Sequence, residues 1–238
     1  MRALADRIEG RASELAEDAL TEMYQDPFWE ARYGERGRRF AREDGQFHVR
    51  YLVEALRAGS PDTLCNYARW LQPLLTTRGM CTLHLAENFE RLAVAIRRVE
   101  QDAEPAVAYL GAATSALTYP PGLARELQEH ATAIAARVMA PGASAGSAEV
   151  PHADDRAASA AMLLSYLADA LALGKPELFM NHLSWAADFL HERGTPRGRL
   201  ITRLQGISEG LRVLSDDSRR RAEELLETAL ERLRSPSP

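Results

Sequence analysis

Residues 51–99 of the chain read YLVEALRAGSPDTLCNYARWLQPLLTTRGMCTLHLAENFERLAVAIRRV, and the same pattern returns without a gap in residues 166–214 as YLADALALGKPELFMNHLSWAADFLHERGTPRGRLITRLQGISEGLRVL. The two stretches lie 115 positions apart, and 13 of their 49 aligned pairs are identical. At most of the other positions that helical spacing places on the apolar face, both stretches carry an apolar residue, which indicates an internal duplication. We therefore predict an all-α fold made of a tandem internal duplication of a helical bundle of about 115 residues.

The composition is that of an ordinary globular protein, with 46% apolar and 26% charged residues. A net charge of −5 argues against a general nucleic-acid binder. The chain has no apolar run of signal-peptide length and none of about 18 residues, so we expect no membrane association. These features predict a soluble, cytoplasmic protein.

Two further features of the composition concern the source of the protein and the state of its thiols. Lys175 is the only lysine among 29 basic residues, which points to a GC-rich bacterial genome. Cys65 and Cys81 are the only cysteines, too few for a disulfide scaffold, and we expect both to be reduced thiols.

The duplication sets the expected domain boundaries. The first bundle is predicted in residues 1–140 and the second in residues 156–234. Between them, residues 141–155 are rich in Gly, Ala and Ser and are predicted to be a flexible linker. Residues 235–238 are predicted to be a disordered tail.

One helix is expected to pack with either bundle. Residues 122–140 align with the predicted first helix, residues 3–24, at an offset of 119, so they also complete the second bundle. Residues 26–42 form an aromatic and arginine-rich segment that only the first bundle has.

Caps and breakers predict where helices begin and end. Asp26-Pro27 is typical of an N-cap followed by proline at the first helical position, and Gly34 and Gly37 are expected to break the helix that follows. Gly59 and Gly79 are predicted to end the first two shared helices in the left-handed conformation, as are the glycines 115 positions later.

The duplication also supplies an internal comparison, because a polar residue in one copy where the other has an apolar one is a functional candidate. His48 is such a residue: its counterpart is Leu163, so the position is expected to be buried. Asp44 precedes it by one helical turn and is predicted to hold it. Replacing His48 by leucine is expected to abolish binding while the fold survives or gains stability.

A metal site is a second possibility for the same region. Asp44, His48, Cys81 and His84 would supply oxygen, nitrogen and sulfur ligands from two helices. Neither spacing is a zinc signature, so these four residues remain weak candidates for a metal or haem.

A pocket is predicted in the first bundle. Pro73 stands within a helix and is expected to kink it near Trp70. The aromatic segment with Trp29 is also confined to this bundle. We expect any ligand-binding site to be bordered by Asp44, His48, Tyr51, Trp70 and Trp29. Trp70 and Trp185 are expected at equivalent core positions, and the second bundle is expected to be structural or dimer-forming.

The strip from Arg32 to Arg42 offers another candidate surface. It holds five arginines that could receive an anionic ligand or an acidic partner, but the carboxylates within and beside it favour a solvated helix face.

A short segment resembles a known family. Residues 119–134 contain Glu129-His130-Ala131-Thr132, which resembles the helical cap of cobalamin-binding light sensors, with Tyr119 in place of a tryptophan nine residues before Glu-His. The resemblance implies cobalamin binding. No cobalamin-binding α/β domain follows, and the duplication already accounts for this helix.

The sequence predicts a function class rather than an activity. Hydrolase, phosphate-loop and nucleotide-binding motifs are absent, so we expect no enzyme. The leading hypothesis is a non-enzymatic bacterial regulatory or adaptor protein that binds a protein partner or small ligand through its first bundle. The alternative is a sensor centred on His48 that binds a metal, haem or another tetrapyrrole. A homodimer is left open.

Overall fold

A computed structural model describes residues 1–138 and 156–235, and within these residues the chain forms helices and no strand. This confirms the all-α prediction. The predicted linker, residues 141–155, lies outside the described residues, as do residues 236–238 of the predicted tail. In that described part of the chain, no helix is long and apolar enough to cross a membrane.

The chain forms two compact units. The first contains Met1–Leu75 and His84–Leu117, and the second contains Thr76–Leu83 and Thr118–Pro238. The last division between the units falls after Leu117, so residues 122–138, which were expected to pack with either bundle, lie in the second unit.

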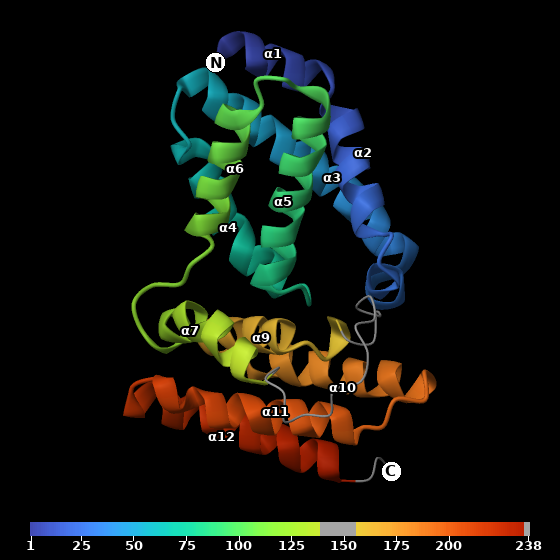
Figure 1. The fold of residues 1–238 in the computed structure, drawn as a ribbon, viewed down its shortest axis with the longest axis vertical. Helices are drawn as coiled ribbons and strands as arrows, with labels where there is room; N and C mark the ends of the chain where they lie inside the picture. Colours follow the sequence, from blue (N-terminus) through green and yellow to red (C-terminus); the bar gives the residue numbers. More distant parts are fainter. Residues whose placement is uncertain (139–155, 236–238) are drawn as a thin grey trace. The chain divides into compact units, whose positions relative to one another are not determined.

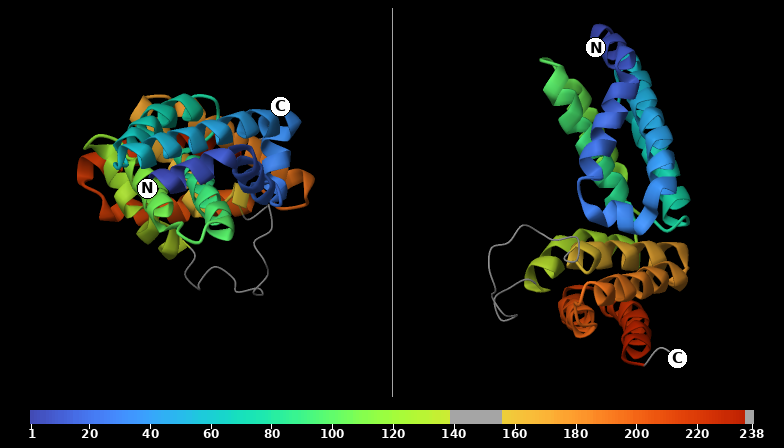
Figure 2. Two further views of the ribbon diagram at one scale, coloured as in Figure 1. Left: turned by 90° about the horizontal axis from the view of Figure 1, so that it is seen from above. Right: turned by 90° about the vertical axis from the view of Figure 1, so that its right-hand side faces the viewer.

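The first unit is built mainly from six helices, namely α1 (Arg2–Gly10), α2 (Ala12–Met23), α3 (Pro27–Ala58), α4 (Asp62–Thr76), α5 (Thr82–Val99) and α6 (Glu104–Ala116) (Figure 1). The long helix α3 packs against α1, α2 and α6, and Figure 2 shows α2 lying alongside it. Fully buried side chains such as Leu15, Phe28, Leu52 and Phe89 form its core.

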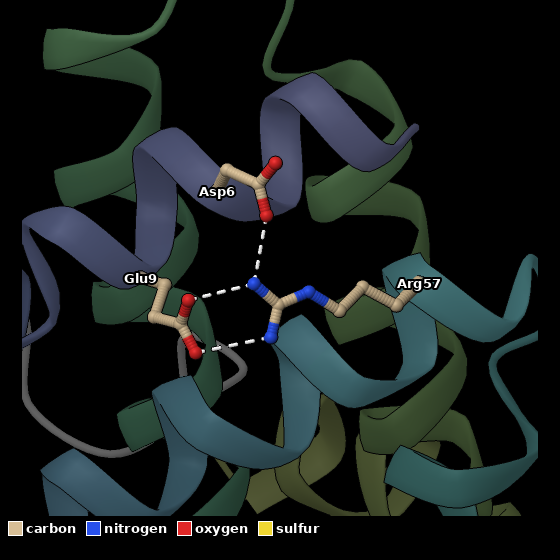
Figure 3. A network of polar contacts seen from close by, with 3 residues as sticks. All are labelled: Asp6, Glu9 and Arg57. Carbon is tan, nitrogen blue, oxygen red and sulfur yellow. Dashed lines mark hydrogen bonds and ion pairs between the residues drawn. The ribbon is translucent and has the colours of Figure 1, made fainter.

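The first helix differs from the prediction. Residues 3–24 were expected to form one helix, but Arg11 leaves the helical conformation with φ −115° and ψ 14° and separates α1 from α2. Gly10 precedes the break, and glycine is a poor helix former. Arg57 of α3 then holds α1 by donating hydrogen bonds of 2.7 Å to Asp6 and of 2.6 and 3.0 Å to Glu9 (Figure 3).

The start of α3 follows its sequence signals. The carboxylate of Asp26 accepts a hydrogen bond of 2.9 Å from the Phe28 N–H, as predicted for the N-cap. Gly34 has φ 57° and ψ −163° and kinks α3, whereas Gly37 stays within the helix. The predicted break is therefore confirmed at Gly34 alone. A Cβ atom at Gly37 would collide with Cβ of Tyr33, so glycine is required there for a different reason.

The second unit contains α7 (Leu123–Val138), α9 (Ala160–Leu173), α10 (Pro176–Glu192), α11 (Gly198–Gly210), the 3-10 turn η1 (Leu211–Val213) and α12 (Asp216–Arg234) (Figure 1). Helix α7 packs against α9 and α11, and α12 lies beside α11. Gly210 permits close packing of α11 on α7, because a Cβ atom there would lie 2.6 Å from Cγ2 of Ile134.

The turn between α4 and α5 belongs to the second unit. The Tyr166 hydroxyl donates a hydrogen bond of 2.8 Å to the carbonyl of Gly79, and the Leu83 N–H donates one of 3.0 Å to Oγ of Ser165. Gly79 has φ 90°, in the left-handed region that glycine tolerates, as predicted for the end of this helix.

Candidate functional site

His48, the centre of the predicted site, is a buried residue of α3 with 1% of its surface exposed. Its Nδ1 and the hydroxyl of Tyr67 on α4 share a hydrogen bond of 2.9 Å. The ring also packs edge-on against Phe89. Burial lowers the pKa of His48 to about 3, so the imidazole is neutral at pH 7. This is the geometry of a core histidine whose Nδ1 is satisfied by a tyrosine.

Tyr67 joins three of the predicted site residues into one aromatic cluster. Its ring stacks on Tyr51, with centroids 4.0 Å apart and planes inclined by 14°, and lies 6.2 Å from the ring of Trp70. Burial, followed by the charges of Asp44 and Tyr51, raises the pKa of the Tyr67 phenol. The structure therefore brings His48, Tyr51 and Trp70 together through Tyr67, with Asp44 nearby. The sequence alone does not single out Tyr67 for this role.

Trp29 lies in a separate aromatic cluster. Its ring centroid is 4.8 Å from that of His84 and 5.7 Å from that of Tyr33, on which it stacks. Phe28 packs edge-on against Trp29 at 5.6 Å. Nδ1 of His84 and the Tyr33 hydroxyl share a hydrogen bond of 3.2 Å. This cluster is the buried core of the aromatic segment rather than the border of a pocket with His48.

The weak metal candidates are not assembled into a site. In residues 1–138 and 156–235, no group of three or more His, Cys, Asp or Glu side chains is placed to hold a metal ion. His48 and His84 each bond a tyrosine. The buried thiol of Cys81 lies 3.5 Å from Sδ of Met162.

The two aligned tryptophans have different surroundings. Trp70 has 61% of its surface exposed, so the prediction of a core position is wrong for this residue. Trp185 is half-buried and stacks on Phe189 at 4.8 Å, and the guanidinium of Arg193 lies 3.7 Å from the centroid of Phe189. The residue aligned with Phe189 is Leu74, which offers Trp70 no aromatic ring.

A surface groove of about 570 Å³ lies along α3 in the first unit. Its apolar lining comes from Ala12, Phe47, Val49 and Val53, and charged or polar side chains border it. Phe47 is 49% exposed. None of the five predicted ligand-binding residues lines this groove.

The arginine strip is only partly neutralised. Arg38 and Arg42 pair with Glu30 at 3.3 Å and Glu17 at 2.6 Å. Arg36 and Arg39 instead place their guanidinium carbons 5.6 and 5.3 Å from the ring centroid of Phe40, which is 43% exposed. The solvated-face prediction therefore fits the first two arginines, while the other two surround an exposed aromatic ring.

A buried carboxylate in the second unit escaped the sequence comparison. Asp169 of α9 is 1% exposed and accepts hydrogen bonds of 2.7 Å from the N–H and 2.6 Å from the hydroxyl of Thr82, and one of 2.8 Å from the Tyr119 hydroxyl. Burial raises the pKa of Asp169 to about 6, although these hydrogen bonds oppose the shift. The residue aligned with Asp169 is Glu54, which is also acidic. A comparison that looks for a polar residue in one copy and an apolar residue in the other therefore does not identify this position.

Comparisons of the chain with protein-family models, with curated proteins and with solved structures give no match. The function is therefore inferred from the arrangement of these side chains alone.

Proposed function

We propose that this chain is a non-enzymatic bacterial regulatory or adaptor protein that binds a protein partner through its first helical unit. The exposed ring of Trp70 is the observation that carries this proposal. Tryptophan is among the residues that contribute most to protein–protein binding, and it is costly to leave in water. In this chain the ring is held on a cluster that reaches from the buried His48 through Tyr67 to the surface.

The exposed apolar side chains point to the same unit. In the described part of the chain, all the large apolar side chains that are exposed belong to the first unit, namely Met1, Phe40, Phe47 and Trp70. Exposed apolar surface of this kind commonly marks an interaction site. The second unit, whose Trp185 is packed on Phe189, is proposed to be structural.

We also propose that the two units arose by tandem duplication of a bundle of about 115 residues. Tyr51 stacks on Tyr67 at 4.0 Å and 14°, and the aligned pair, Tyr166 and His182, stacks at 3.9 Å and 13°. Gly59 and Gly174 have φ 72° and 61° at the ends of α3 and α9. Both similarities support a common origin.

We do not extend the proposal to a sensor centred on His48. Its Nδ1 is bonded to Tyr67 and the ring is closed off from solvent, so no contact favours a metal or tetrapyrrole there.

Affinity capture with matched variants tests the proposal. Full-length wild type, Trp70→Ala and the control Glu90→Ala, an exposed residue of α5, are immobilised and incubated with extract of the source cells. We expect at least one protein to be retained by wild type and by the control and to fall about tenfold or more with Trp70→Ala. Equal retention by all three folded proteins would overturn the proposal.

A further inference from the structure

The exposed face of α3 carries a stripe of six residues that alternate at spacings of four and three. They are Arg36, Phe40, Glu43, Phe47, Arg50 and Glu54, and all are exposed. Such spacing keeps side chains on one line along a helix, and it is the spacing by which two helices pair. We call these six residues the α3 stripe.

We infer that the α3 stripe binds the same stripe of a second copy of this chain, with the two helices antiparallel about a two-fold axis that crosses the stripe midway between Glu43 and Phe47. A two-fold axis makes each contact occur twice. The facing pairs are then Arg36 with Glu54, Phe40 with Arg50, and Glu43 with Phe47.

The charge order along the stripe favours this arrangement. A parallel pairing would put every charged residue opposite its own copy, and like charges in an interface are costly. In the antiparallel pairing Arg36 meets Glu54 of the second copy. Arg50 comes within one helical turn of Glu43 of the second copy, because the two positions differ by three residues in height. Both phenylalanines lie between these charges.

The contacts that the charged stripe residues make within one copy do not prevent them from pairing with a second copy. Among the described residues no ion pair joins Arg36 to a carboxylate, and its guanidinium lies over the ring of Phe40. Arg50 pairs with Glu54 of the same helix at 3.2 Å, but both are well exposed. An exposed pair of this kind is worth little and is readily exchanged for a contact across an interface.

The groove beside the stripe supplies room for the second copy. Its apolar lining consists of Ala12, Val49, Val53 and the stripe residue Phe47. In the antiparallel register Phe47 of the second copy lies at the level of Glu43, which also lines the groove. The ring of Phe47 therefore serves as the apolar anchor and the groove of the other copy receives it.

This inference does not rest on the Trp70 surface, because Trp70 lies on α4 and takes no part in the stripe, although the exposed Phe40 and Phe47 also support partner binding by the first unit. It also differs from the expectation that the second bundle forms a dimer. A dimer through α3 leaves the Trp70 surface of each copy to a different partner.

Sedimentation velocity of the full chain over a concentration series at low salt tests the inference. We expect a monomer–dimer equilibrium for wild type, a loss of dimer for Phe47→Ser, and no change for the control Glu90→Arg. A wild type that stays monomeric at every concentration would overturn the inference, as would a dimer that Phe47→Ser leaves intact.

A charge swap tests the antiparallel register. Arg36→Glu and Glu54→Arg each place like charges opposite one another twice per dimer, so each is expected to weaken dimerisation about tenfold. The double variant R36E/E54R restores opposite charges and is expected to recover most of the affinity. If the double variant is no better than the weaker single variant, the proposed pairing is wrong.

Discussion

Trp70 and Trp185 occupy aligned positions in two similar stretches of sequence, yet one is exposed and the other is packed. Trp185 stacks on Phe189, beside which Arg193 adds a cation. The ring of Trp70 lies 6.2 Å from that of Tyr67, and the position aligned with Phe189 is occupied by Leu74. One difference between the two positions is therefore that Trp70 lacks the aromatic neighbour on which Trp185 stacks.

The comparison separates two uses of one residue type. In the second unit the tryptophan contributes to stability, because its apolar area is removed from water. In the first unit most of that area stays in water, and the fold gains little from it. We therefore assign Trp185 to the fold, and the exposure of Trp70 supports the proposal that it contributes to binding.

Replacing each tryptophan by alanine gives the largest expected difference. Trp185→Ala removes a stacked ring and is expected to lower the free energy of unfolding by about 2–4 kcal/mol. Trp70→Ala changes a mostly exposed position and is expected to cost no more than about 1 kcal/mol. Urea denaturation of the full chain measures both. Similar losses would break the comparison.

His48, which is hydrogen-bonded to Tyr67 beside Trp70, provides a second test of this comparison. The sequence predicts that His48→Leu preserves or raises stability, but the structure shows that leucine would leave the buried Tyr67 hydroxyl without its partner. We now expect His48→Leu to lower the free energy of unfolding by about 1–3 kcal/mol. Adding Tyr67→Phe should recover part of the loss, because the orphaned hydroxyl is removed as well. Strictly additive losses in denaturation experiments would argue against the coupling.

The two units also differ in how their buried titratable groups respond to pH. The pKa of Asp169 rises from its ordinary value of 3.8 to about 6, so the folded state holds this proton more tightly than the unfolded state does. Its stabilising effect is full below pH 3.8 and is lost as the pH rises through about 6.

Asp169→Asn isolates this effect. The stability of wild type relative to the variant is expected to fall by about 1–3 kcal/mol between pH 4 and 6 and then to level off. His48, whose pKa is lowered, has the opposite sign: its contribution is lost as the pH falls from 6.5 toward about 3. Because wild type and Asp169→Asn both keep His48, the effect of His48 on stability cancels in the difference between them. A difference that is flat from pH 4 to 7 would contradict the assignment.

The smallest expected effect comes from placing an aromatic residue beside Trp70, as Phe189 lies beside Trp185. Leu74→Phe gives Trp70 the neighbour that Trp185 has, next to Arg78 in the position aligned with Arg193. The variant is expected to gain about 0.5–1 kcal/mol and to shift the tryptophan emission to shorter wavelength. An unchanged stability and spectrum would show that the neighbour does not explain the exposure.

The fold was largely predictable from the sequence, because apolar periodicity, Asp26-Pro27 and the glycines act locally. Gly34 and Gly59 end or kink helices through their own backbone conformation, so their neighbours in sequence are enough to predict them. The break at Arg11 was missed, because the apolar stripe continues across it.

The candidate site was less predictable, because its contacts join distant residues. Nothing near His48 in sequence marks Tyr67 as its partner, 19 residues away. Nor does the sequence near Asp169 show that Thr82 and Tyr119 bind it. Phe40 and Phe47 did carry a local signal, since their spacing of seven places both on one face of α3.

The most direct test of the account is oxidative footprinting of the three tryptophans, first in the purified full-length protein and then in extract of the source cells. Trp29, 3% exposed, serves as the internal reference, and Trp70 is expected to be modified fastest in the purified protein. In the extract, we predict protection of Trp70 while Trp29 and Trp185 stay unchanged. Equal modification of Trp70 in both conditions would contradict the claim that this surface binds a partner.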